Sequence, residues 1–346
     1  MIKVLIVDDS KMMQESLAYI LNTDPEFKIV GYASNGKEAI ELTQKYSPDV
    51  ITMDWQMPVI NGYEATKEIM ETNPTPIVVV TGSIAANDVS ISFSLMEAGA
   101  LAVLKKPHGL KHSSFDDECF ELIQTLKLMS EIKLVRRIKK TKGNNKSVNG
   151  REKLKDGRYK LIATGASTGG PIALQKFLTN LPSNISVPIL IVQHISAGFV
   201  KGFVEWLMNS THYPIHVAID GEEALPGHVY VAPDNYHMGI DSRLRIFLSN
   251  DPPENGLRPA VSYLFKSCAN YLGDKTIAVL LSGMGKDGSE ELKLLKDNGS
   301  LTYAQDEKSS VVHGMPGEAI KLGGACHIYP PEEIGKSIQN VFNSDN

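Results

Sequence analysis

The sequence predicts a two-domain α/β protein in which each domain contains a mostly parallel β-sheet. Short β-branched runs alternate with helical patterns through the first 125 residues, and a second alternation begins near Arg158. Between them lies a basic stretch, TKGNNKSVNGREKLKDG, which is rich in glycine and asparagine, lacks aromatic residues and is typical of a linker. A length of 346 residues also favours two hydrophobic cores over one.

In the first half, five short apolar runs predict strands, and the segments between them have the periodicity of amphipathic helices. The predicted strands are residues 3–8, 28–33, 49–54, 76–82 and 101–105, and the predicted helices are residues 11–22, 36–46, 62–72 and 87–99. This alternation indicates a five-stranded parallel sheet with helices on both faces. Such sheets carry their functional sites outside the carboxyl ends of the strands.

The second half has a similar alternation with a different middle section. The predicted strands are residues 160–166, 187–194, 215–219, 228–233, 243–249, 276–283, 301–306 and 325–329, and helices are predicted after Gly170, Gly198, Pro259, Gly288 and Pro316. The section from Pro214 to Ser249 is rich in strands, for which we expect hairpins against the parallel sheet. The predicted fold is a doubly wound, mostly parallel α/β sheet with a β-hairpin extension.

Composition excludes several classes of protein. The amino terminus lacks a secretory leader, and no apolar run approaches the roughly 20 residues that span a bilayer, so we expect a cytoplasmic protein without membrane insertion. The three cysteines are far apart, which predicts neither a disulfide framework nor a zinc site. The basic stretch has no interleaved aromatic residues and belongs to no recognisable nucleic-acid-binding module, so we expect no nucleic-acid partner.

Polar side chains follow four of the five predicted strands in the first half. They are Asp8, Asp9, Asp54, Thr81 and Lys106. Three carboxylates at one sheet edge repel each other unless a cation joins them, and Mg²⁺ prefers such oxygen ligands. A carboxylate flanked by Mg²⁺ and a lysine is suited to accept a phosphoryl group, because the cations neutralise the charge of the transferring oxygens.

The turn GASTGG at residues 165–170 has two interpretations. A nucleotide-binding loop would use the glycines to approach a phosphate, but the segment matches neither the dinucleotide spacing nor the Walker pattern. A serine hydrolase would use Ser167, which lies in a G-x-S-x-G sequence between a predicted strand and a predicted helix. Ser167 would then need a base and an orienting acid from elsewhere in the chain.

Two arrangements of base and acid are compatible with the spacing. His194 ends the next predicted strand, and Asp287 follows a later strand in SGMGKDG, which gives the order Ser, His, Asp. An ordinary α/β-hydrolase has the order Ser, Asp, His, in which His313 or His327 would be the base. Spacing alone does not decide between them.

Residues 1 to about 122 resemble the receiver domains of response regulators, through VDDS, MDWQMP, NG at 61–62, VVVTG and the Lys106-Pro107 pair. The resemblance implies a flavodoxin-like fold and a phosphorylation site. By it, Asp54 is the phosphoacceptor, Mg²⁺ is bound by Asp9, Asp54 and the Gln56 carbonyl with Asp8 as an outer ligand, and Thr81 and Lys106 form the switch pair. Val103 stands where many receivers carry an aromatic residue, so a switch that buries an aromatic ring is not expected.

With GASTGGP, QH, LPGHVYVAP, HM, RPAV, SGMGKDG and GMPGEAI in order, the whole chain resembles chemotaxis response-regulator protein-glutamate methylesterases. The resemblance implies a receiver domain at 1–122, a helical and then flexible basic linker at 123–157, and a catalytic domain at 158–346. It implies a catalytic triad of Ser167, His194 and Asp287 and removes the case for His313. Backbone N–H groups at Thr168 and Met284 are candidate oxyanion donors, and Arg258 either binds substrate or is solvated.

The implied reaction is hydrolysis of glutamate methyl esters on chemoreceptors, with release of methanol, together with glutamine deamidation. A histidine kinase would phosphorylate the receiver domain, and one hypothesis is that the unphosphorylated receiver blocks the Ser167 edge of the sheet. We expect Mg²⁺ at the receiver, no cofactor in the catalytic domain and a monomeric chain. The alternative is a response regulator of another two-component pathway, whose second domain is catalytically silent and docks on a partner.

Overall fold

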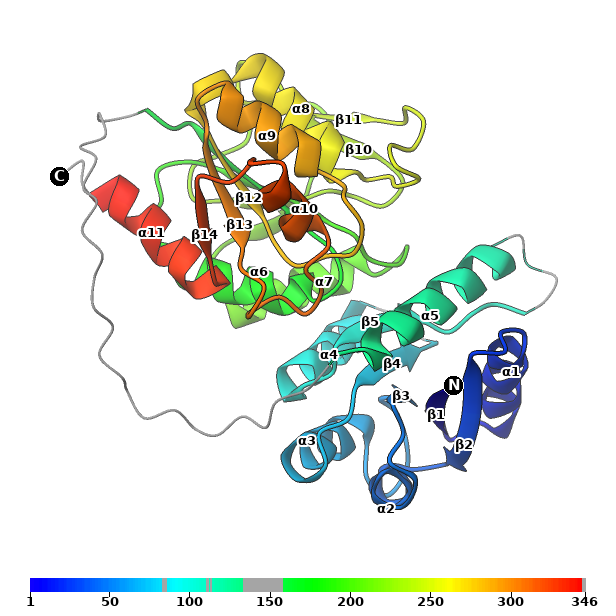
Figure 1. Cartoon of the computed structure of the whole chain (residues 1–346). Helices are drawn as coiled ribbons and strands as arrows, with labels where there is room; N and C mark the ends of the chain where they lie inside the picture. The colour runs from blue at the N-terminus through cyan, green and yellow to red at the C-terminus, as the bar shows by residue number, and fades with distance from the viewer. Residues whose placement is uncertain (83–85, 110–111, 113, 133–157, 344–346) are drawn as a thin grey trace. The chain divides into compact units, whose positions relative to one another are not determined.

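The structure is a computed structural model that describes residues 1–82, 86–109, 112, 114–132 and 158–343 (Figure 1). The chain divides into two compact units, Met1–Arg151 and Glu152–Asn346, and each is described by itself. Residues 133–157 of the predicted linker lie outside the described residues. Within the described ranges, no helix is both long and apolar enough to cross a bilayer.

Five parallel strands form the sheet of the N-terminal unit, in the order β2-β1-β3-β4-β5. The strands are β1 (Ile2–Val7), β2 (Phe27–Ala33), β3 (Val50–Met53), β4 (Ile77–Thr81) and β5 (Ala102–Lys105). All five match the sequence prediction, and the order is that of a flavodoxin-like fold. Strand order reverses between β1 and β3, so the residues that follow these two strands lie together at the switch point.

Helices of the N-terminal unit lie in two groups, with α1 beside α5 and with α3 between α2 and α4. Their bounds are α1 (Lys11–Asn22), α2 (Gly36–Tyr46), α3 (Gly62–Thr72), α4 (Ala86–Ala98) and α5 (Phe115–Ser130). The first three begin where a side-chain oxygen of Ser10, Asn35 or Asn61 accepts a backbone N–H three residues further on. Such caps satisfy donors that the first turn leaves unpaired.

Seven parallel strands form the main sheet of the C-terminal unit, in the order β14-β13-β12-β6-β7-β9-β8. The strands are β6 (Leu161–Ala166), β7 (Ile189–Gln193), β8 (Ile215–Val217), β9 (Val229–Val231), β12 (Thr276–Leu280), β13 (Leu301–Gln305) and β14 (His327–Tyr329). From β6 the chain extends the sheet in one direction, with β8 at the edge and β9 between β7 and β8, and from β12 it extends the sheet in the other direction. The switch point therefore lies between β6 and β12, where a binding crevice is expected.

The middle section contains one hairpin rather than several. Strands β10 (His237–Ile240) and β11 (Ile246–Ser249) form an antiparallel pair, as predicted for the extension. The prediction of hairpins is wrong for the two preceding strands, since β8 and β9 join the main sheet in parallel. Strand β9 lies between β7 and β8, and all three of its residues are buried. Burial inside the main sheet therefore explains why β9 does not form a hairpin.

Six α-helices accompany this sheet in the described residues. They are α6 (Gly170–Thr179), α7 (Val200–Ser210), α8 (Val261–Tyr271), α9 (Ser289–Asp297), α10 (Met315–Lys321) and α11 (Pro331–Asn343). The sequence predicted the first five but not α11, which packs on α6 and contains the fully buried Ile334 and Ile338. Helix α6 begins shortly after the carboxyl end of β6. Helix α8 begins shortly after Arg258, and α9 begins shortly after Asp287.

Candidate functional site

Ser167 occupies a tight turn between β6 and α6. The strand ends at Ala166, and α6 begins at Gly170 after Gly169, whose φ of +76° lies in the left-handed region. The backbone N–H of Ser167 donates to the Ser282 carbonyl at 3.0 Å, which ties the turn to the loop after β12. Gly283 lies against the turn so closely that a Cβ there would be 2.8 Å from the Ser167 Cβ.

His194 reaches the same edge from the neighbouring strand. Strands β6 and β7 pair in register, with Ala166 opposite Gln193, and the His194 N–H donates to the Ala166 carbonyl at 3.0 Å. Ser167 and His194 are therefore the next residues along two adjacent parallel strands. The structure places the predicted nucleophile and the predicted base side by side along the backbone.

Asp287 comes from the other side of β6, in the loop between β12 and α9. Its side chain is 2% exposed, and Oδ2 lies 3.0 Å from Nε2 of His194. This is an ion-pair distance, although the ring is not aligned for a hydrogen bond. Oδ2 also accepts the N–H of Val261 at 2.6 Å, and Oδ1 accepts that of Ser262 at 3.1 Å. These are the first two residues of α8, so the carboxylate lies at a helix amino terminus, which favours an anion.

The surroundings of Asp287 favour its ionised form. Burial raises the pKa of this carboxyl, but contact with the His194 ring and hydrogen bonds from Ser262 and Val261 outweigh burial. The net pKa of Asp287 therefore lies below its ordinary value. A buried carboxylate that stays charged can stabilise a positive charge on the neighbouring imidazole.

Because Nε2 of His194 faces Asp287, Nδ1 is the ring nitrogen left to serve Ser167. In the part of the chain that the structure describes, no hydrogen bond joins the Ser167 hydroxyl to the imidazole. Catalytic hydrogen bonds are often long or misaligned before substrate binds, so the missing bond does not exclude a triad of these residues. The triad stays a prediction at that contact.

The predicted oxyanion donors flank the Ser167 turn. Thr168 follows Ser167 directly, and Met284 follows Gly283, the residue packed against Ser167. Among the described residues, neither the Thr168 nor the Met284 N–H donates a hydrogen bond to another protein group. Both N–H groups are thus available to a ligand beside the nucleophile.

Arg258 is engaged within its own loop. Its Nη1 donates to the carbonyls of Asn250 and Asp251, at 2.8 and 3.0 Å, and its side chain is half-buried. These contacts brace residues 250–258, the loop that leads into α8. The predicted role of Arg258 in substrate binding stays a proposal.

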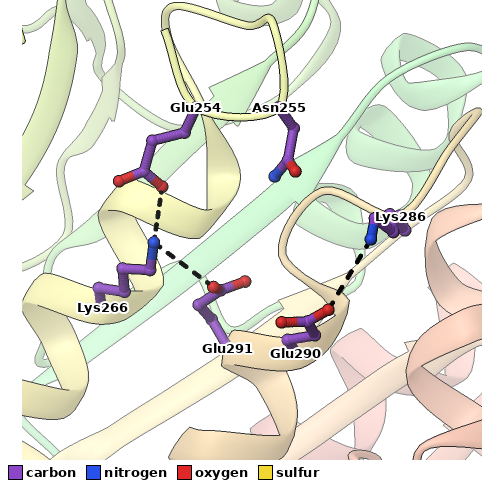
Figure 2. Close-up of a pocket in the computed structure, with 6 residues that line it drawn as sticks. All are labelled: Glu254, Asn255, Lys266, Lys286, Glu290 and Glu291. Carbon is purple, nitrogen blue, oxygen red and sulfur yellow. Dashed lines mark hydrogen bonds and ion pairs between the residues drawn. The ribbon is translucent and has the colours of Figure 1, made fainter. Parts of the chain in front are cut away.

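A charged pocket opens between the α8 and α9 segments (Figure 2). Its lining residues are Glu254, Asn255, Lys266, Lys286, Glu290 and Glu291. The Lys266 ammonium lies between two carboxylates, 2.9 Å from Glu254 and 3.7 Å from Glu291. Asn255 connects the pocket to the site, because its Nδ2 lies 3.4 Å from Oδ1 of Asp287. The pocket therefore borders the buried acid and carries charge of both signs.

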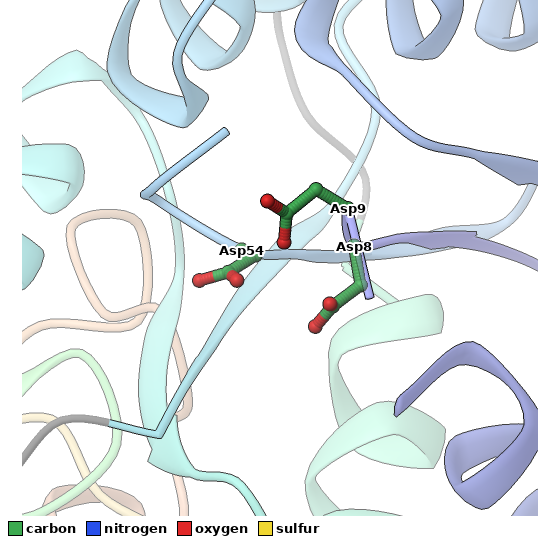
Figure 3. A group of neighbouring side chains, drawn as sticks. All are labelled: Asp8, Asp9 and Asp54. Atoms are coloured by element: carbon green, nitrogen blue, oxygen red, sulfur yellow. The ribbon is translucent and has the colours of Figure 1, made fainter. Parts of the chain in front are cut away.

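The N-terminal unit holds a second site at its own switch point. Carboxylate oxygens of Asp8, Asp9 and Asp54 lie within 4.8 Å of one another (Figure 3). Nζ of Lys106 lies 2.6 Å from Oδ2 of both Asp8 and Asp54. Asp8 and Asp54 are buried, whereas Asp9 is exposed. The predicted acidic cluster is thus confirmed, and its donor set is the oxygen chemistry that suits Mg²⁺.

Electrostatics couple the acids to the lysine. Burial raises the pKa of Asp54, and repulsion from Asp8 adds to this, while Lys106 and the Gln56 N–H lower it only in part. Burial lowers the pKa of Lys106, but hydrogen bonds and charges of Asp54 and Asp8 outweigh burial and give a net increase. Thr81, the buried last residue of β4, accepts the Lys106 N–H on its carbonyl at 2.8 Å.

Val103 is half-buried and packs against the apolar core of the N-terminal unit. In the other unit, His313 is held by Ser310 at 3.3 Å and pairs as an isolated bridge with Gly283. Two polar residues that no sequence motif singles out connect the loops around Ser167. The Ser282 hydroxyl lies 2.8 Å from the Thr168 carbonyl and 3.1 Å from the Val312 carbonyl, and the Gln193 amide donates to the Ser167 carbonyl.

These features define a class of protein: a response-regulator receiver fold joined to an α/β domain with a serine-hydrolase-like edge. Comparison with known proteins agrees. The model of the CheB methylesterase family matches residues 162–338, and that of the response regulator receiver domain matches residues 4–112. The chain belongs to the protein-glutamate methylesterase/protein-glutamine glutaminase family.

Relatives of that name match over nearly the whole chain. The protein from Nitrosospira multiformis is 48% identical over 99% of this chain and 97% of its own length. The protein from Geobacter metallireducens is 47% identical over 99% of both chains. The crystal structure of the Thermotoga maritima CheB methylesterase catalytic domain aligns with a TM-score of 0.51 and 36% identity, over 53% of this chain and 98% of that one. The family assignment excludes the nucleotide-loop interpretation of GASTGG and does not favour a silent docking module.

Proposed function

We propose that this chain hydrolyses glutamate methyl esters on chemoreceptors, in the cytoplasm and as a monomer. Ser167 is the nucleophile, His194 the general base and Asp287 the group that orients the imidazole. The observation that carries this proposal is the 3.0 Å approach of His194 to an Asp287 carboxylate held by the first N–H groups of α8. The names of the full-length relatives point to the same reaction.

In the proposed reaction, Nδ1 of His194 accepts the hydroxyl proton while Ser167 Oγ attacks the ester carbonyl. The resulting oxyanion accepts hydrogen bonds from the N–H groups of Thr168 and Met284; loss of one such donor typically costs about 10²–10³ in rate. The imidazolium returns its proton to the departing methoxide, so methanol leaves and a glutamyl ester of Ser167 remains. Water, deprotonated by His194, then releases glutamate and restores the hydroxyl.

The same residues support hydrolysis of glutamine. The tetrahedral intermediate then expels ammonia instead of methanol, and the second half of the reaction is unchanged. Arg258 and the charged pocket beside Asp287 are the proposed contacts for receptor groups around the reacting side chain. No metal is needed for either reaction in this proposal.

For the receiver, we infer phosphorylation of Asp54 by a histidine kinase and place the domain boundaries at 1–122, 123–157 and 158–346. Asp9, Asp54 and the Gln56 carbonyl would hold Mg²⁺, with Asp8 in the outer shell, and the ion would neutralise phosphoryl oxygens. Lys106 pairs with the phosphorylated side chain, and Thr81 donates its hydroxyl to it. The tight oxygen cluster and the half-buried ammonium of Lys106 support these roles.

Methanol release from methylated receptor tests the proposal. Wild type should release methanol faster with a small phosphodonor and Mg²⁺, Asp54→Asn should not respond, and Ser167→Ala should be inactive in both conditions. Ser210→Ala, a half-buried change at the end of α7, is the control. If Ser167→Ala retained the wild-type rate, the esterase proposal would be wrong; if Asp54→Asn responded normally, the phosphorylation proposal would be wrong.

A further inference from the structure

We propose that Gln193 is a positioning residue that fixes the separation between the nucleophile and the base. The inference rests on the proposed function, because it concerns Ser167 and His194. Gln193 is the last residue of β7, and its Nε2 donates to the Ser167 carbonyl at 2.9 Å and to the His194 carbonyl at 2.8 Å. A single amide group therefore uses both of its N–H bonds to hold the two catalytic residues.

This tie lies just beyond the last backbone hydrogen bond between the two strands. The ladder of β6 and β7 ends with the pairing of Ala166 and Gln193 and with the bond from the His194 N–H to the Ala166 carbonyl. Past this point Ser167 turns into α6, while His194 enters the loop before α7. Within the described residues, no other backbone hydrogen bond connects these two departing segments.

Two features favour this orientation of the Gln193 amide. The residue is 3% exposed, and its Oε1, which accepts no hydrogen bond from the described residues, lies beside Gly170 at the amino terminus of α6, where a partial negative charge is favoured. A Cβ at Gly170 would lie 2.2 Å from Oε1, so only glycine leaves room for it. Rotating the amide by half a turn would direct Oε1 at two carbonyl oxygens, which cannot donate a hydrogen bond to it.

Gln193 should therefore act on the rate of the chemical step. The Ser167 carbonyl accepts both the Gly170 N–H at 2.8 Å and the Gln193 amide, so its position is defined by two bonds. Misplacing a reacting group by about 1 Å can cost on the order of 10²-fold in rate. Because Gln193 is buried and acts through the backbone, its loss should leave substrate binding nearly unchanged.

Two substitutions and one control test this role. Gln193→Met keeps the length but removes both donors, and Gln193→Glu directs a carboxylate at the two carbonyls. Thr302→Val is the control: Thr302 is equally buried, and its hydroxyl donates to the Gly324 carbonyl at 2.7 Å, in β13 and outside the catalytic loops. The assay measures the rates of hydrolysis of p-nitrophenyl acetate and of methylated receptor. Each rate is divided by the amount of enzyme whose serine reacts with an organophosphonate.

We expect kcat per reactive serine to fall about 10–100-fold in Gln193→Met, with KM changed less than twofold. The kcat of Gln193→Glu should be lower still at neutral pH. As the pH falls, it should rise relative to the kcat of Gln193→Met, because a protonated carboxyl can donate one hydrogen bond. Thr302→Val should lose stability but keep its kcat. Wild-type kcat per reactive serine in Gln193→Met would overturn the inference, whatever its stability.

Amide hydrogen exchange gives a readout that does not depend on turnover. Exchange at the His194 and Gly170 N–H groups should be faster in Gln193→Met and unchanged in Thr302→Val. If wild type showed no Ser167-dependent hydrolysis, the proposed function would fail, yet exchange would still decide whether Gln193 ties the two segments. Equal exchange in wild type and Gln193→Met would refute the tie.

Discussion

Asp287 and His194, far apart in the sequence, meet at 3.0 Å between Oδ2 and Nε2. The carboxylate is almost completely buried, yet the amino terminus of α8 and the imidazole keep its pKa below the ordinary value. A buried acid whose charge is already compensated needs little rearrangement when the imidazole becomes charged. The pair is therefore prepared for the step in which His194 accepts a proton.

Asp287→Asn should abolish most of the activity while the protein stays folded. The amide keeps the size of the side chain but cannot stabilise the imidazolium, and in a comparable triad this change costs about 10⁴ in kcat. Methanol release and far-UV circular dichroism measure the two properties. Asp297→Asn, an exposed change on α9, should leave the rate unchanged; activity of Asp287→Asn within threefold of wild type would contradict the assigned role.

Asp287 should also make stability depend on acid pH. Its folded pKa is lowered, so its contribution to the free energy of unfolding is complete above the unfolded pKa of about 3.9 and is lost as the pH falls through the folded pKa. Urea unfolding followed by Trp206, in a Trp55→Phe background, reports on this unit alone. The difference between wild type and Asp287→Asn should shrink below about pH 4; a difference independent of pH would be inconsistent with an ionised Asp287.

Magnesium binding should respond to Lys106 in a definite direction. Its ammonium lies 2.6 Å from Asp8 and Asp54 and therefore competes with a divalent cation for the same oxygens. Lys106→Met should tighten Mg²⁺ binding by about tenfold, a change of ~1.4 kcal/mol, and Asp9→Asn should weaken it. Trp55, next to Asp54, is the fluorescence probe in a Trp206→Phe background, with Lys45→Met as the control. Weaker Mg²⁺ binding by Lys106→Met would contradict this competition.

Val59→Gly should stabilise the receiver. Val59 has a φ of 71° and is 79% exposed, so the β-branched side chain adopts a left-handed backbone conformation with few compensating contacts. That conformation costs a residue with a Cβ about 1–2 kcal/mol. Glycine avoids this cost, but part of the gain is lost because its unfolded state has more conformational entropy. We expect a gain of about 1 kcal/mol in the free energy of unfolding, measured by Trp55 fluorescence in urea. Val59→Ala, which retains a Cβ, should gain less, and a loss of stability in Val59→Gly would argue against strain at this turn.

Most of the fold could be predicted because buried parallel strands are continuous apolar runs and helices carry a 3.6-residue period. The same runs do not encode their partners, which is why β9 was expected in a hairpin although it pairs with β7 and β8. The missed helix α11 did carry a signal, with Glu332 and Glu333 in its first turn and buried Ile334 and Ile338 one turn apart.

Ser167, His194 and Asp287 could be placed at one sheet edge, because each follows one of three strands that lie side by side. Spacing did not decide which histidine is the base, and the contact of Ser167 with His194 stays a prediction. The sequence does not encode which ring nitrogen of His194 faces the acid, since that depends on the rotamer. Gln193 and Ser282 were missed for a related reason: they act by hydrogen bonds to backbone carbonyls, which any side chain with a donor group at the correct distance can make. No spacing or residue type distinguishes them in the sequence.

Gly283→Ala should slow catalysis more than its effect on stability suggests. A Cβ at this position would lie 2.3 Å from Sδ of Met315 and 2.8 Å from Cβ of Ser167, so the nucleophile turn must shift to accept it. We expect kcat to fall about 10–100-fold and the free energy of unfolding to fall by about 1–3 kcal/mol.

Gly239→Ala is the matched control, because its Cβ would lie equally close, 2.3 Å, to the Phe247 ring in the β10–β11 hairpin. It should lose comparable stability but keep its kcat per reactive serine, measured with the same ester and organophosphonate titration. Equal effects of the two substitutions on kcat would mean that crowding anywhere in the unit slows the reaction, and that the Ser167 turn has no special sensitivity to its neighbour. A selective effect of Gly283→Ala would locate the reaction at Ser167.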